Sequence, residues 1–203
     1  MLIMILTGIG LAAGSGLNAY LPLLILALAD RFTTVIDLDT PWDVLSSFWG
    51  LVILLLVLPL ELIPDKIARV DHVSDLVHSA IRPALGAAAF MAVASQEEGF
   101  QMVAAFLLGL LIAGAVHWIK ASTRPGITKT TRGIGNPIVS LLEDALSVVF
   151  ALVAIFLPYG VIAIVPLGLL LLFRTYRRMR SGETRMMALF NPGASTSTSA
   201  GKQ

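Results

Sequence analysis

The chain has 203 residues, of which 57% are hydrophobic and only 13% carry a charge, with a mean hydropathy of +0.86. A soluble domain needs about a quarter of its residues charged to cover its surface, so this composition excludes a soluble globular protein and predicts that lipid covers much of the molecule. The absence of cysteine excludes disulfides and thiolate chemistry, and the net charge of +1 does not point to a partner. We expect neither a cofactor nor a nucleic-acid partner.

Six apolar segments approach the length of about 20 residues that a membrane-spanning helix requires. They are residues 2–28, 44–63, 76–95, 100–119, 137–157 and 158–173. Such long, uniformly apolar runs exclude barrel strands. The sequence therefore predicts an all-α integral membrane protein of about six transmembrane or re-entrant helices, with a polytopic domain at 1–180 and a flexible cytoplasmic tail at 181–203.

The first segment is interrupted by several glycines, by Asn18 and by Pro22. It therefore fits either a full crossing or a re-entrant hairpin. Six full crossings would place both termini on one side of the membrane. Of the 14 lysines and arginines, only Arg31 then lies in an outer loop. Because basic residues accumulate on the cytoplasmic side, we expect both termini in the cytoplasm.

The third segment begins with an unusual density of ionisable residues. Asp71, Asp75, His78 and Arg82 are spaced four, three and four apart, which places them on one helical face. Pro83 disfavours helical geometry at Arg82, so we expect a break there that lines a cavity. Asp71, Asp75 and His78 have a spacing that fits a divalent metal. The alternative is salt bridging to Arg82 and to neighbouring basic residues.

Two pairs of sequence elements echo each other. His117, Lys120, Arg124 and Pro125 repeat the theme of His78, Arg82 and Pro83, and a Gly-x-Gly turn leads to Asn18 as another leads to Asn136. Internal symmetry with broken helices is typical of transporters built from inverted repeats, whose site lies where the breaks meet. The alternative for the asparagines is a plain turn cap.

Acidic residues lie at membrane depth in two of the predicted spans. They are Glu61 in the second span and Glu143 and Asp144 in the fifth. A charge at that depth is costly unless it is paired, hydrated or neutralised. We therefore expect these acids to pair with basic residues around a hydrated vestibule open to the cytoplasm. The candidate basic partners are Arg82, Arg124, Lys66 and Lys120. Glu143 and Asp144 fit proton-coupling carboxylates equally well.

Several of these motifs, taken together, resemble a known family. They read GLAAGSGLNAYLP (10–22), LADR (28–31), PDK (64–66), VD (70–71), HSAIRPALGA (78–87), HWIKASTRP (117–125) and GIGNPIVSLLED (133–144). In this order they resemble the small multi-pass bacterial membrane proteins called domain of unknown function 4126. The family's motif positions fall on Asn18, Asp65, Lys66, Asp71, His78, Arg82, His117, Lys120, Arg124, Asn136, Ser140, Glu143 and Asp144. Asp75 and Trp118 depart from the pattern. The resemblance implies a multi-pass protein of a bacterial inner membrane and no particular substrate.

The leading functional hypothesis is a small transporter or lipid-carrier translocase that handles an anionic substrate bearing a phosphate or carboxylate. Guanidinium groups match such anions in geometry and charge, and Glu143 or Asp144 would couple transport to protons. The predicted substrate-binding residues are Arg82, Arg124, Lys66, Lys120, His78, His117, Asn18 and Asn136. We also expect a homo-oligomer in contact with membrane lipid, the bound group being an anionic lipid or a small anion.

Two alternatives come from other functional classes. The first is a membrane scaffold or regulator that docks a cytoplasmic partner on the basic residues 174–180 and the amphipathic helix 65–82. The second is a metal-dependent membrane enzyme that uses Asp71, Asp75 and His78. None of the usual motifs of nucleotide-binding or hydrolytic enzymes occurs in the chain, so the sequence offers no positive support for an enzyme.

Overall fold

The protein is an all-α bundle in the computed structural model, which describes residues 1–62, 71–97, 100–131 and 135–190. These residues form seven α-helices and two short 3-10 helices, η1 (Trp42–Leu45) and η3 (Pro158–Gly160), and they contain no strand. The α-helices are α1 (Leu2–Leu17), α2 (Leu21–Phe32), α3 (Phe48–Leu62), α4 (Asp71–Ala94), α5 (Met102–Thr131), α6 (Gly135–Phe156) and α7 (Val161–Phe190). The predicted fold class is confirmed.

Three stretches of the described chain are long and apolar enough to cross a membrane. They are Met102–Thr123, Asn136–Phe156 and Pro158–Arg177. Shorter apolar helices cover Leu2–Leu17, Phe48–Leu62 and Ser79–Ala94. Many large apolar side chains on these helices face outward, among them Trp49, Leu111 and Ile162. Such a surface is stable against lipid acyl chains, so the molecule is an all-α membrane protein.

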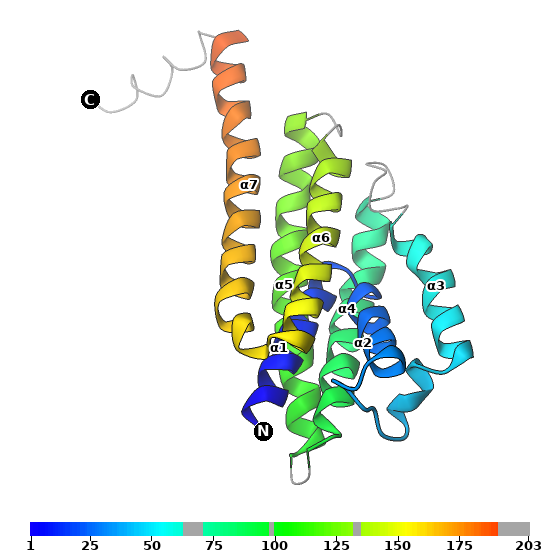
Figure 1. The fold of residues 1–203 in the computed structure, drawn as a ribbon. Coiled ribbons are helices and arrows are strands. Elements are labelled where there is room, and N and C mark those ends of the chain that lie inside the picture. The colour runs from blue at the N-terminus through cyan, green and yellow to red at the C-terminus, as the bar shows by residue number, and fades with distance from the viewer. Residues whose placement is uncertain (63–70, 98–99, 132–134, 191–203) are drawn as a thin grey trace.

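The first apolar segment forms a hairpin. Its helix α1 ends at Leu17, the chain is extended at Asn18, and α2 then returns toward the end of the bundle at which α1 began (Figure 1). Asn18 and Ala19 are buried at the turn, so the turn lies within the bundle. The first apolar segment is therefore two helices joined by a buried turn and not one continuous helix, which favours the re-entrant hairpin of the two possibilities that the sequence left open.

The N-terminus and the end of α7 lie at opposite ends of the bundle (Figure 1). The ammonium group of Met1 contacts the carboxylate of Glu97, which follows α4. Helix α7 ends beyond the opposite end of the bundle. The prediction that both termini lie in the cytoplasm stays a prediction, and the opposite positions of Met1 and the end of α7 favour an alternative in which they lie on different sides.

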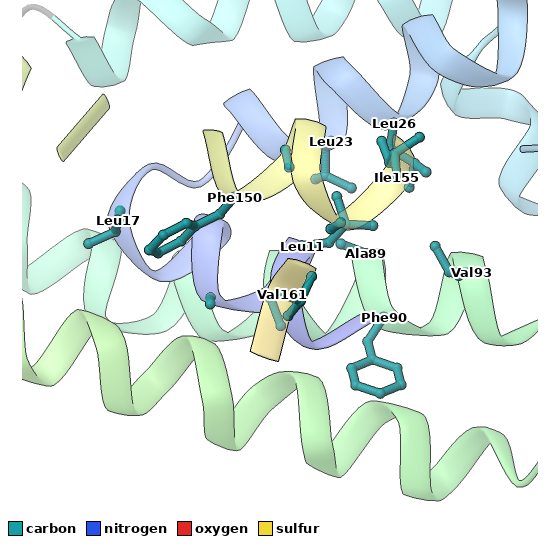
Figure 2. Close-up of a cluster of buried hydrophobic side chains, with 14 of the residues drawn as sticks. Leu11, Leu17, Leu23, Leu26, Ala89, Phe90, Val93, Phe150, Ile155 and Val161 are labelled. Atoms are coloured by element: carbon teal, nitrogen blue, oxygen red, sulfur yellow. The ribbon is translucent and has the colours of Figure 1, made fainter. Parts of the chain in front are cut away.

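Helix α1 runs through the middle of the bundle, in contact with α4, α5 and α6. Figure 2 shows its Leu11 in one apolar cluster with Ala89 of α4 and Ile155 of α6. Gly16 permits a close approach to α5: a Cβ at this position would lie 2.6 Å from the carbonyl oxygen of Ala113. Glycine lets two backbones meet at such a distance, and this packing holds the hairpin turn in the centre.

Helix α4 continues through Pro83, so the predicted break after Arg82 is wrong. Pro83 removes one helical hydrogen bond, a local cost of about 3 kcal/mol. Gly114 of α5 faces its ring, and a Cβ there would still lie 3.7 Å away. Close packing against α5 therefore keeps α4 helical. Helix α5 likewise continues past Pro125 to Thr131.

The predicted tail and the predicted internal repeat both stay predictions. Helix α7 extends to Phe190, into the segment predicted as a tail, while residues 191–203 lie outside the described residues. The predicted internal repeat has no test in the fold and stays a prediction.

Candidate functional site

A layer of buried polar and charged side chains surrounds the hairpin turn, and we call it the charge layer. Its residues come from the α1–α2 turn, from the last turn of α3, and from α4, α5, α6 and α7. Its members are Asn18, Glu61, Arg82, His117, Lys120, Glu143, Asp144 and Tyr176. Each is less than one-tenth exposed, so these groups interact mainly with one another.

Arg82 and Glu61 form the first ion pair of the layer. Both side chains are completely buried, and Nη2 of Arg82 lies 3.0 Å from Oε1 of Glu61. Nε of Arg82 donates a second hydrogen bond of 3.0 Å to the same oxygen. The guanidinium fork thus joins α4 to α3, a contact that a lysine could not reproduce.

His117 extends this pair toward the surface. Its Nδ1 lies 3.1 Å from Nη1 of Arg82. A guanidinium group has donors only, so Nδ1 is the acceptor and the ring proton is on Nε2. Nε2 lies 3.1 Å from the hydroxyl of Ser79, whose residue is exposed on α4. A chain of hydrogen bonds therefore runs from Glu61 at the centre to an exposed residue.

Opposite charges bind the two backbone ends at the hairpin turn. The N–H of Ala19, before α2, donates to both carboxylate oxygens of Glu61 at 3.0 and 2.9 Å. Nζ of Lys120 donates to the carbonyl of Leu17, at the end of α1, at 2.9 Å. A helix carries partial positive charge at its N-terminus and partial negative charge at its C-terminus, so both contacts are electrostatically favourable.

Lys120 and Glu143 form the second ion pair. Nζ of Lys120 lies 3.1 Å from Oε2 of Glu143, and both side chains are completely buried. The hydroxyl of Tyr176 donates to the other carboxylate oxygen, Oε1. Glu143 therefore joins α5, α6 and α7, and through Lys120 it reaches the end of α1.

Asn18 combines a structural role with a contact to an acid. Its Oδ1 accepts hydrogen bonds from the N–H groups of Tyr20 and Leu21, at 3.2 and 3.1 Å, and so caps the start of α2. Its Nδ2 donates to Oδ1 of Asp144 at 3.0 Å. The plain turn cap considered from the sequence is present, and the same side chain is also part of the charge layer.

The buried face of α6 is polar over its first half. Asn136, Ser140, Glu143 and Ser147 are spaced four, three and four apart, and all are completely buried. Ser147 donates to the carbonyl of Gly14 at 2.9 Å. Ser140 and, in α1, Ser15 are the two buried residues of the described chain whose side-chain polar atom has no hydrogen-bond partner. An unsatisfied buried hydroxyl costs about 1–3 kcal/mol.

Most of the residues selected from the sequence meet in this layer. The structure brings together Asn18, Arg82, His117, Lys120, Glu143 and Asp144. The predicted pairing of buried acids with basic residues is confirmed for Glu61 with Arg82 and for Glu143 with Lys120. Asn136 is buried one turn before Ser140 in α6. The predicted hydrated vestibule stays a prediction.

The remaining selected residues cannot be assigned contacts. Lys66 lies outside the described residues, as do the side chains of Asp71, Asp75, His78 and Arg124, whose backbone is helical. Within the part of the chain that the structure describes, no group of three metal-ligating side chains occurs.

Tyr176 is the member of the charge layer that sequence reasoning missed. It lies between Arg174 and Arg177, and both arginines are exposed. The basic run indicated an interfacial segment and drew attention away from the one aromatic residue that points inward. The available signal was helical spacing: Tyr176 follows the buried Leu172 by four residues.

The comparisons with known proteins identify the family. A model described as "Domain of unknown function (DUF4126)" matches residues 5–178, nearly the whole bundle. The chain belongs to this family. No curated protein and no solved structure matches it.

Proposed function

We propose that the protein is a small transporter of an anionic substrate and that the charge layer is its binding site. The observation that carries this proposal is the meeting of two completely buried ion pairs at the turn of a re-entrant hairpin. Broken helices of this kind surround the central sites of many transporters. Following the resemblance, we assign the protein to a bacterial inner membrane.

The energetic cost of burying charge supports a functional role for the charge layer. Ionisable groups within a membrane bundle are costly and usually mark substrate or ion pathways. A purely structural contact would be provided equally well by apolar residues of similar volume, since buried ion pairs are often no more stable than such replacements. Here Arg82 and Lys120 are each paired with a side-chain carboxylate, and an incoming anion could replace either carboxylate.

Two further features fit this proposal. The unsatisfied hydroxyl of Ser140 lies one helical turn from Glu143 and Asp144, and a bound substrate or water would supply its missing hydrogen bond. Glu143 is our candidate for proton coupling. Protonation of its carboxylate would weaken the contact with Lys120, which in turn holds the end of α1.

The test is native mass spectrometry of the protein purified in mild detergent. We would compare wild type with the double variant Arg82→Gln/Glu61→Gln, which removes one ion pair without leaving a lone buried charge. Arg174→Gln, at an exposed position of α7, is the matched control. We expect an anion bound to wild type and to the control, and at least tenfold less of it bound to the folded double variant.

Two outcomes would overturn the proposal. One is a wild-type protein without a bound anion under conditions in which added anionic lipids and small carboxylates are also not retained. The other is an anion that the double variant binds as well as wild type. Either result would make the charge layer structural and favour the scaffold hypothesis, whose test is capture of a cytoplasmic partner by α7.

A further inference from the structure

The carboxylate of Glu61 is bound as a ligand would be. Within the described residues, three donor groups approach it: the N–H of Ala19, which reaches both oxygens, and Nε and Nη2 of Arg82, which lie 3.0 Å from Oε1. The carboxylate and Arg82 are completely buried. These donors form a cradle for one planar carboxylate group.

The cradle does not depend on Glu61 for its shape. Arg82 is also fixed by the contact of its Nη1 with His117, and α4 packs closely against α5 just after Arg82. The N–H of Ala19 is positioned by the hairpin, where Asn18 caps α2 and Lys120 holds the end of α1. Donors that are held by other contacts would keep their positions if the carboxylate left.

Glu61 lies on α3, the α-helix with the smallest share of buried residues in the described part of the bundle. Only Leu54 and Glu61 are buried among the residues of α3. Figure 1 shows α3 at the outer edge, and its main neighbours are α2 and η1. The ion pair with Arg82 and the hydrogen bonds from the N–H of Ala19 therefore attach the end of α3 to the centre of the molecule. Release of this carboxylate would remove these attachments.

We propose that the Glu61 carboxylate occupies the binding site of the substrate, and that the substrate is a carboxylate that displaces Glu61 from the cradle. This inference rests on the proposed function and names the substrate class. The exchange replaces one carboxylate by another on the same three donors, so the buried charge of Arg82 is never left without an anion. Displacement of Glu61 loosens α3 and couples binding to a change of conformation.

The test is chemical rescue of the variant Glu61→Ala. This substitution leaves a carboxylate-sized space that faces Arg82 and the N–H of Ala19. We expect the thermal midpoint of the purified variant to fall and formate or acetate to raise it by about 4 °C at about ten times the dissociation constant. Acetamide, which has the shape of acetate without its charge, should have no effect.

The matched control is Leu54→Ala, because Leu54 is the other buried residue of α3 and its removal leaves an apolar space. Formate should not stabilise this variant or wild type. We also expect Glu61→Ala to bind a substrate carboxylate at least tenfold more tightly than wild type, because the internal competitor is gone.

Two results would overturn the inference. The first is a folded Glu61→Ala variant that formate and acetate do not stabilise. The second is rescue by inorganic phosphate but not by carboxylates, which would assign the cradle to a tetrahedral anion. In both cases an anion on wild type that is lost from Arg82→Gln/Glu61→Gln would leave the proposed transporter function standing, so the two proposals fail separately.

Discussion

At the scale of single residues, Lys120 connects more of the molecule than its one charge indicates. Its ammonium group binds the carbonyl of Leu17 and the carboxylate of Glu143, and Glu143 also accepts a hydrogen bond from Tyr176. Four helices therefore meet around one buried nitrogen atom. Replacement of a buried charge removes its contacts and also leaves the opposite charge uncompensated, and the second effect is usually the larger.

We therefore expect Lys120→Met to lower the free energy of unfolding by about 3–5 kcal/mol. The double variant Lys120→Met/Glu143→Gln should recover more than half of this loss, because no buried charge is then unpaired. Equilibrium unfolding in detergent, analysed as a double-mutant cycle, measures both effects. Arg174→Met, at an exposed position, is the control and should change stability little. Losses in the two single variants that simply add would contradict the pairing.

At the scale of elements, small residues determine how closely the helices approach. Gly109 of α5 faces the backbone of α4: a Cβ there would lie 2.6 Å from Cα of Ala87 and 2.6 Å from the carbonyl oxygen of Gly86. Neither backbone atom can move without a shift of the whole helix. Gly114, on the same helix, meets only the ring of Pro83 at 3.7 Å or more.

This difference predicts opposite results for two alanine substitutions. Gly109→Ala should separate α4 from α5 and lower stability by about 1–3 kcal/mol. Gly114→Ala should be neutral or slightly stabilising, since alanine is the better helix former by about 1 kcal/mol. Thermal unfolding of the purified variants measures the comparison. Equal effects at the two positions would show that α4 and α5 do not approach as closely as described.

At the scale of helices, some parts of the structure could be predicted from the sequence and others could not. The apolar runs and the acids within them were sufficient to predict an all-α membrane protein whose buried acids pair with basic residues, since buried charges need partners; which acid pairs with which base came only from the structure. The course of α4 through Pro83 could not be predicted, because the stabilising packing comes from α5, a later segment of the chain. The inward direction of Tyr176 was equally hidden, because the neighbouring arginines indicated an interface.

At the scale of the whole molecule, the hairpin and the distribution of charge together predict a membrane topology. The N-terminus, Glu97 and the segment between α2 and α3 lie at one end of the bundle (Figure 1). That segment carries Asp37, Asp39 and Asp43 and no basic residue. The helix α7, with the exposed Arg174 and Arg177, leads to the opposite end. By the positive-inside rule, we expect the acidic end to face outward.

We therefore predict an outer N-terminus and a cytoplasmic C-terminus. The chain has no cysteine, so single cysteines report position without background. A membrane-impermeant maleimide added to intact cells should label cysteines introduced at Leu2 and Asp39, both exposed at the acidic end, and should label one at Lys202 only after the membrane is opened. Leu2 and Lys202 labelled from the same side would restore six full crossings. That result would require residues 2–28 to form one continuous crossing. The contacts of Glu61 and Lys120 with the buried turn between α1 and α2 oppose this.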